Sequence, residues 1–163
     1  LVLLYNREKE FGNAQRVLRT LKHRFPRNRI VWLESASTWL RNERAVQAEH
    51  ALIEGFSKLN NDDRVRMYGE EALWHLKRGS ARIARGQTAE ALPDLIAASE
   101  SNTSAWIKGQ AYVELGKVSD LEGHRANAAE HYARGEKLCK RSKHQRCVKD
   151  AKELKNNGYS LQQ

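Results

Sequence analysis

The chain has 163 residues, of which 30% are charged and 40% are hydrophobic, and its formal net charge at pH 7 is +9. This length suits one domain, and the mean hydropathy of -0.77 excludes a membrane span. Because helix-forming residues dominate, only two prolines occur and no alternating apolar run indicates a strand, we predict an all-α fold.

Apolar residues recur at helical spacing along the chain and are interrupted by short polar or glycine-bearing turns. The pattern predicts helices over about 1–10, 14–25, 29–40, 45–59, 64–85, 89–101, 105–122, 125–141 and 143–156. Residues 11–13 are expected to form a turn, and residues 60–63 a polar break that caps the helix after it.

Individual residues mark several of these ends. Pro26 should stop the second helix, Asn28 and Thr88 should cap the helices that follow them, and residues 102–104 should cap another. Pro93 lies five residues into its helix, where it removes a backbone hydrogen bond, so we expect a bend or a late start there.

One stretch combines a helix, a glycine-bearing turn and a second helix with landmarks at fixed spacing. Tyr112, Leu115 and Gly116 precede the turn, Ala128 lies twelve residues after Gly116, and Tyr132 lies four residues further on. Two small residues at this spacing would let paired helices approach closely. The same step of twelve recurs from Ala36 to Ala48, from Gly79 to Ala91 and, in part, from Val2 to Ala14.

These landmarks resemble the tetratricopeptide repeat (TPR) pattern W-x2-L-G-x2-Y…A-x3-F…P. The resemblance covers roughly residues 1–142 and implies a partial repeat at 1–28, repeats at about 29–62, 63–105 and 106–142, and a capping helix at about 143–156. It implies a single TPR-like domain over 1–163, a right-handed solenoid of antiparallel helix-turn-helix repeats. Because the chain starts inside its first helix, we expect it to be a piece of a longer protein.

The turns inside the repeats can be placed by residue. They fall at Lys9, Glu43, Gly86 and Gly123, so the steps between repeats are 34, 43 and 37 residues. The first step has the TPR length, and the other two imply first helices lengthened by about two turns and one turn.

The resemblance implies a scaffold that binds a protein or a peptide in the concave groove lined by the first helix of each repeat, with no chemistry of its own. Residues three before and one, four and five after each small residue should face that groove. With two residues of the partial repeat they are Asn6, Arg7, Leu33, Ser37, Leu40, Arg41, Leu76, Ser80, Ile83, Ala84, Val113, Lys117, Asp120 and Leu121. The alternative is that the apolar members only pack first helix against first helix.

The positive charge lies mainly at the two ends of the chain. Residues 1–28 carry a net +5 and residues 143–163 carry +3, whereas 29–62, 63–105 and 106–142 carry -1, 0 and +2. Nucleic-acid binding needs a continuous basic stripe, so we expect a solvated basic surface instead. Two alternatives stay open: a basic helical module that contacts nucleic acid or another anionic surface, and the non-catalytic tail of an enzyme lying upstream.

No motif indicates catalysis, a metal or a cofactor. The six histidines lack the pairing of a zinc-protease helix, and neither a Gly-rich phosphate loop nor a G-x-S-x-G turn occurs. Cys139, His144 and Cys147 do not have zinc-finger spacing, so a packing role is favoured over a metal site, and a Cys139–Cys147 disulfide stays open. The tryptophans at 32, 39, 74 and 106 are expected in the core.

Overall fold

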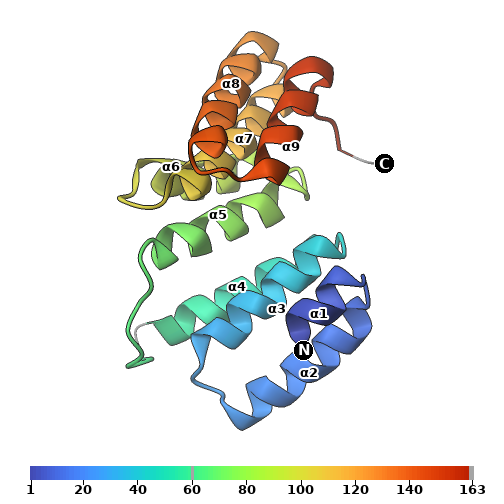
Figure 1. Cartoon of the computed structure of the whole chain (residues 1–163), viewed down its shortest axis with the longest axis vertical. Coiled ribbons are helices and arrows are strands. Elements are labelled where there is room, and N and C mark those ends of the chain that lie inside the picture. The colour runs from blue at the N-terminus through green and yellow to red at the C-terminus, as the bar shows by residue number, and fades with distance from the viewer. Residues whose placement is uncertain (60, 162–163) are drawn as a thin grey trace. The chain divides into compact units, whose positions relative to one another are not determined.

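The computed structural model describes residues 1–59 and 61–161, and all regular secondary structure in these residues is helical. The helices are α1 (Val2–Arg7), α2 (Phe11–Arg24), α3 (Arg29–Arg41), α4 (Ala45–Leu59), α5 (Glu70–Ile83), α6 (Thr88–Glu100), α7 (Ala105–Leu121), α8 (Arg125–Arg141) and α9 (Gln145–Asn157) (Figure 1). The all-α prediction is therefore confirmed. None of the described helices is long and apolar enough to cross a membrane.

The chain divides into two compact units, which we call unit 1 (Leu1–Val65) and unit 2 (Arg66–Gln163). In unit 1, α1 packs on α2, α2 on α3 and α3 on α4. In unit 2, each helix from α5 to α9 packs on the next, and α7 also contacts α5 and α9. Packing between consecutive helices is what a chain of helical hairpins requires.

Five of the turns between described helices have the same backbone geometry. Each contains one residue with φ between 56° and 80°, namely Lys9, Glu43, Gly86, Gly123 and Lys143. At each, the N–H of the following residue donates to the carbonyl five residues earlier, over 2.7–3.0 Å. This bond and the left-handed residue together form a helix-ending cap of the Schellman type. The first four turns lie where the twelve-residue spacing placed them, and the fifth joins α8 to α9.

Unit 1 confirms part of the expected helix boundaries. Asn28 caps α3 by accepting a hydrogen bond from the Ile30 N–H at 3.1 Å, and α4 has the expected bounds. The predicted turn at residues 11–13 is wrong, because α2 already begins at Phe11. The turn at the left-handed residue Lys9 ends the preceding helix at Arg7, three residues earlier than expected.

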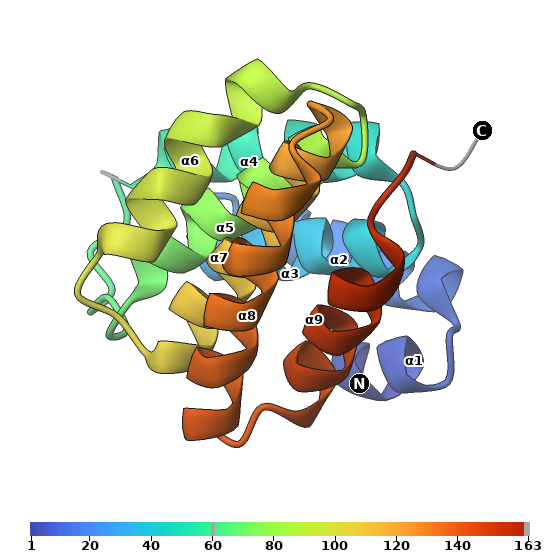
Figure 2. The same cartoon turned by 90° about the horizontal axis from the view of Figure 1, so that it is seen from above.

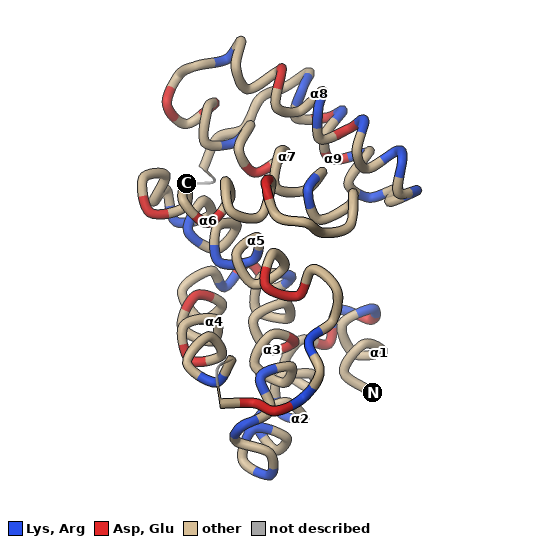
Figure 3. The backbone as a smooth tube through the Cα atoms, turned by 90° about the vertical axis from the view of Figure 1, so that its left-hand side faces the viewer, with Lys and Arg blue, Asp and Glu red and all other residues tan. Residues whose placement is uncertain are grey.

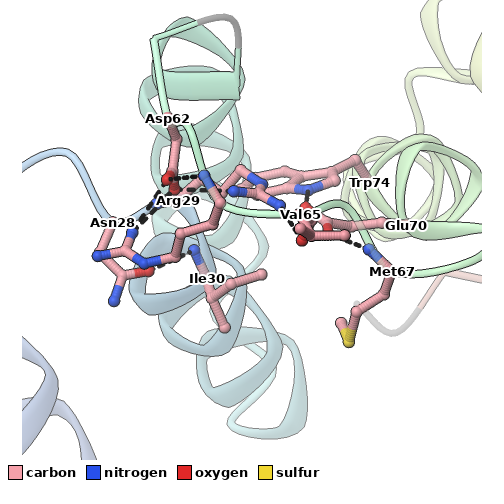
Figure 4. Close-up of polar contacts among 9 residues, drawn as sticks. Asn28, Arg29, Ile30, Asp62, Val65, Met67, Glu70 and Trp74 are labelled. Carbon is pink, nitrogen blue, oxygen red and sulfur yellow. Dashed lines mark hydrogen bonds and ion pairs between the residues drawn. The ribbon is translucent and has the colours of Figure 1, made fainter.

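The helix predicted from residue 64 is also wrong, since α5 begins only at Glu70. Asp62 does not cap α5: its carboxylate accepts from the backbone N–H of Arg29 at 3.1 Å and pairs with the Arg29 guanidinium at 2.9 Å (Figure 4). Arg29 also donates to the Val65 carbonyl at 3.2 Å. These bonds hold residues 62–65 at the start of α3, and Asn60 lies outside the described residues.

The true start of α5 is determined by glycine and glutamate. Gly69 is the N-cap with φ 74°, and the Glu70 carboxylate accepts from the Met67 N–H at 3.0 Å and from the Trp74 indole N–H at 3.5 Å (Figure 4). Trp74 is fully buried, as expected for a core tryptophan.

Two capping expectations in unit 2 are not met, and one of the two alternatives at Pro93 is absent. Thr88 is the first residue of α6 and makes no capping bond, and the N-cap Ser104 of α7 makes none either. The helix α6 runs unbroken from Thr88 past Pro93, so there is no late start.

The helices α7, α8 and α9 lie side by side in unit 2 (Figures 1 and 2). A Cβ atom placed on Gly116 would lie 2.5 Å from the Tyr132 ring, and one on Gly135 would lie 2.8 Å from the Gly109 carbonyl. Ala128 has no exposed surface. The small residues therefore mark close helix contacts, as predicted, and the Gly109–Gly135 approach is an additional one.

A disulfide between Cys139 and Cys147 joins α8 to α9, with the two Cα atoms 5.8 Å apart. Both cysteines are buried in a cluster that also contains Val113, Tyr132 and Ala151. The disulfide, which the sequence left open, is therefore present. Val148 and Leu154 of α9 also pack on this cluster, which fixes α9 against α8.

Candidate binding surfaces

The groove residues predicted in unit 1 are divided between the interior and the surface. Asn6 is buried and donates from Nδ2 to the Thr38 hydroxyl at 2.9 Å, while the buried Ser37 donates to the Leu33 carbonyl at 2.8 Å. Leu33 itself is 3% exposed. The more accessible predicted residues of this unit are Arg7, Leu40 and Arg41.

In unit 2 the larger apolar residues that were predicted to line the groove lie inside the protein. Leu76 and Ile83 belong to the main core cluster, and Val113 belongs to the cluster around the disulfide. Ser80 is half-buried and Ala84 is exposed. Leu76, Ile83 and Val113 pack helix against helix, so they are not available to a ligand.

The remaining predicted residues gather at the carboxyl end of α7. Lys117 donates to Glu114 at 2.8 Å, and Asp120 accepts from the Tyr132 hydroxyl at 2.7 Å and from Arg125 at 3.0 Å. Burial and the bond to Asp120 raise the pKa of Tyr132. Leu121 is partly buried against the main core. This end of α7 therefore carries fixed polar groups beside an apolar surface.

An open groove of about 350 Å³ lies in unit 1. It is lined by side chains from α2, α3 and α4: Lys22, Trp32, Trp39, Val46, Gln47, His50 and Ala51. Trp32 and Trp39 are two helical turns apart on α3 and only partly buried, while Val46 is 59% exposed. The prediction that these two tryptophans belong to the core thus holds only in part, because both also form a wall of the groove.

The cation of this groove is Lys22. Its Nζ lies 4.2 Å from the centroid of the Trp32 ring and donates to the Ser35 hydroxyl at 2.7 Å. Burial, together with repulsion from Arg19, lowers the pKa of Lys22 to about 8. The helix α2 contains lysine and arginine but no aspartate or glutamate. Figure 3 marks the lysine and arginine positions in blue. An acidic group placed in the groove would therefore be attracted by Lys22 and by the basic residues of α2.

A wider cleft of about 630 Å³ lies in unit 2, between the start of α5 and the end of α6. Its lining includes Glu70, Glu71, His75 and Glu100. Beneath it the buried Asp94 bonds to His75 at 2.7 Å and to two arginines of α5. Burial raises the pKa of Asp94, but the hydrogen bonds and charges of Arg78 and His75 lower it by more, so that it falls to about 2. This network connects α5 to α6 and has the character of a structural contact.

Comparison with known proteins identifies no family: no protein-family model matches the chain, and no curated protein has a significantly matching sequence. The TPR resemblance therefore stays a prediction from residue spacing, and any statement about function rests on the geometry of the two units.

Proposed function

We propose that the chain is a protein-interaction module, a right-handed solenoid of TPR-like hairpins with no catalytic activity of its own, that binds a segment of a partner protein. The observation that supports this proposal is the tryptophan-lined groove of unit 1, where large apolar side chains are exposed beside Lys22, and where Lys58 Nζ also lies 5.9 Å from the centroid of the Trp32 ring. Such a mixture of aromatic anchors and charged contacts is typical of sites for short protein segments.

The partner segment we propose is acidic and amphipathic. Its apolar side chains would cover Trp39 and Val46, and a carboxylate would approach Lys22, whose pKa is lowered to about 8 by burial and by repulsion from Arg19. Contact with a carboxylate would raise this pKa towards its ordinary value of 10.5. The basic residues of α2 would add long-range attraction.

A peptide fits this groove better than a nucleic-acid backbone does. Phosphates need several cations spaced along a strand, whereas this lining has Lys22 as its one lysine or arginine among the described residues. Salt dependence distinguishes the two kinds of ligand. The affinity for a phosphate backbone should fall about 1,000-fold or more between about 50 and 200 mM salt, whereas the affinity for a peptide bound mainly by apolar contacts should fall far less.

The experiment is a selection of random short peptides displayed against the protein, followed by affinity measurement on the enriched sequences. We expect enrichment of acidic sequences with aromatic or aliphatic residues. Val46→Glu should weaken their binding about tenfold or more, because it places a carboxylate on the apolar wall.

Ile53→Glu is the matched control, because Ile53 is 51% exposed on the same helix but does not line the groove. This variant should bind the selected peptides as the parent does. Equal weakening by both substitutions, no enriched peptides, or preferential binding of an oligonucleotide with a steep salt dependence would each contradict the proposal.

A further inference from the structure

The chain leaves α9 through Gly158 and then continues over unit 2. Gly158 has φ 76° and donates its N–H to the Leu154 carbonyl at 2.8 Å. Because this backbone conformation ends the helix, residues 159–161 can run in a new direction.

Tyr159 makes specific contacts with the end of α7. Its backbone N–H donates to Asp120 Oδ2 at 2.8 Å, and its ring centroid lies 5.1 Å from Lys117 Nζ. The ring is half-buried against the main core cluster of unit 2. Burial raises the pKa of Tyr159 although Lys117 opposes the change, so the hydroxyl stays protonated at neutral pH. Both α7 residues in this contact were among those predicted to bind a partner.

The groups that receive Tyr159 are held in place by other residues. Asp120 is 5% exposed and also bonds to Tyr132 and Arg125, while Lys117 bonds to Glu114. Polar groups fixed in this way lose little further freedom when a ligand binds. The site is therefore preorganised without the help of the segment that occupies it.

Leu161 continues the contact to the turn between α5 and α6. A Cβ atom on Gly86 would lie 2.9 Å from Leu161 Cδ1, so glycine at this position makes room for the leucine. Ser160, between Tyr159 and Leu161, is exposed. Because Tyr159 and Leu161 both contact the rest of unit 2 while the residue between them is exposed, a Tyr-x-Leu pattern suits this surface.

We propose that Lys117, Asp120 and Gly86 form a binding site for an extended partner peptide with tyrosine followed two residues later by leucine, and that residues 158–161 occupy it as an internal competitor. This site lies in unit 2 and does not depend on the tryptophan-lined groove. A tethered segment has an effective concentration of about 1 mM. Partner peptides must therefore bind well enough to displace the segment.

The test uses a synthetic peptide with the sequence of residues 156–161, Asn-Asn-Gly-Tyr-Ser-Leu, titrated into the full chain and followed by NMR amide shifts. The Tyr159→Ala variant, whose own segment has lost its anchor, should bind the peptide about tenfold tighter or more than the parent chain does. Shifts should concentrate at Lys117, Asp120 and Gly86. The Ser160→Ala variant is the control and should behave as the parent does.

Equal affinity for the parent and for Tyr159→Ala, no binding to that variant, or shifts elsewhere would overturn the proposal. A peptide with alanine in place of its tyrosine should not bind, and binding by it would also overturn the proposal. If Tyr159→Ala lowers helicity, Leu161→Ala decides, because Leu161 is 40% exposed and contributes less to folding. That variant should bind the peptide severalfold tighter than the parent, and an unchanged affinity would refute the site.

Discussion

Replacing Gly109 with alanine is expected to destabilise unit 2, although alanine is the better helix former. The new Cβ atom would overlap Cys139 Sγ and lie 3.1 Å from both the Gly135 carbonyl oxygen and the Cys139 backbone nitrogen. Two of these atoms belong to backbone and the third to a disulfide, so none can move aside by changing a rotamer. The close approach of α7 and α8 must therefore open.

The magnitude follows from two opposing effects. Alanine gains about 1 kcal/mol over glycine in a helix interior, and overpacking a rigid contact costs about 1–3 kcal/mol. Because the obstructing atoms are fixed, we take the upper half of that range and expect a net loss of about 1–2 kcal/mol. For a unit of roughly 100 residues this corresponds to a Tm lower by about 5–10 °C.

Thermal unfolding followed by circular dichroism measures this effect, and Gly12→Ala serves as the control. Gly12 lies in the first turn of α2, and a Cβ atom there would meet nothing within 4 Å. The control should be neutral or stabilising by up to about 1 kcal/mol. If Gly109→Ala changes the Tm by the same amount as Gly12→Ala, the close approach of α7 and α8 at Gly109 is contradicted.

Three other perturbations test the packing of unit 2. Since the pKa of Asp94 falls from 3.8 to about 2 on folding, its charge contributes about 2 kcal/mol, fully present above about pH 4 and lost as the pH falls through about 2. Asp94→Asn should therefore lower the urea midpoint at pH 7 and reduce its change between pH 4 and 2; an unaltered pH profile would contradict this. Ala128→Leu should cost about 1–3 kcal/mol, because the site has no exposed surface, and an unchanged unfolding midpoint would argue against the paired small residues. Replacing Cys139 and Cys147 with alanine should remove about 2–3 kcal/mol for a loop of 8 residues and abolish any effect of reductant on Tm, whereas a parent Tm insensitive to complete reduction would count against the cross-link.

Much of the fold could be predicted because its turns follow local rules. The steps of twelve between small residues placed Lys9, Glu43, Gly86 and Gly123 at turns, and all four have positive φ. Only two of these four are glycine, so glycine alone would not have located them. Spacing succeeded because the small residues fix where two helices meet, and the turn lies between them.

The start of α5 could not be predicted from spacing. Val65 and Tyr68 continue the helical period of the residues that follow, yet both are exposed, at 93% and 68%. The segment is held instead by the buried guanidinium of Arg29, which is more than thirty residues away in the sequence. A long-range ion pair of this kind leaves no periodic signal.

The candidate sites were predicted only in part. The offsets from each small residue selected Lys117 and Asp120, which do contact Tyr159. The same offsets also selected Leu76 and Val113, which are buried. A helix in a stack packs on more than one neighbour, so position on one face does not separate core from surface. The groove beside Trp39 was missed because tryptophan spacing is the same for a core and for an open wall.

The shared turn has a consequence for how such a chain tolerates change in length. Its defining bonds join backbone atoms within six residues, so each turn sets the angle between its two helices whatever their lengths. The unequal steps of 34, 43 and 37 residues have two origins. The α7 helix has 17 residues against 13 in α3, so it is longer by about one turn, as expected. The lengthening by two turns expected for the step of 43 is wrong, because α5 has only 14 residues and residues 61–69 before it are not helical. Both a longer helix and an added irregular stretch between hairpins are therefore compatible with the same turn within each hairpin.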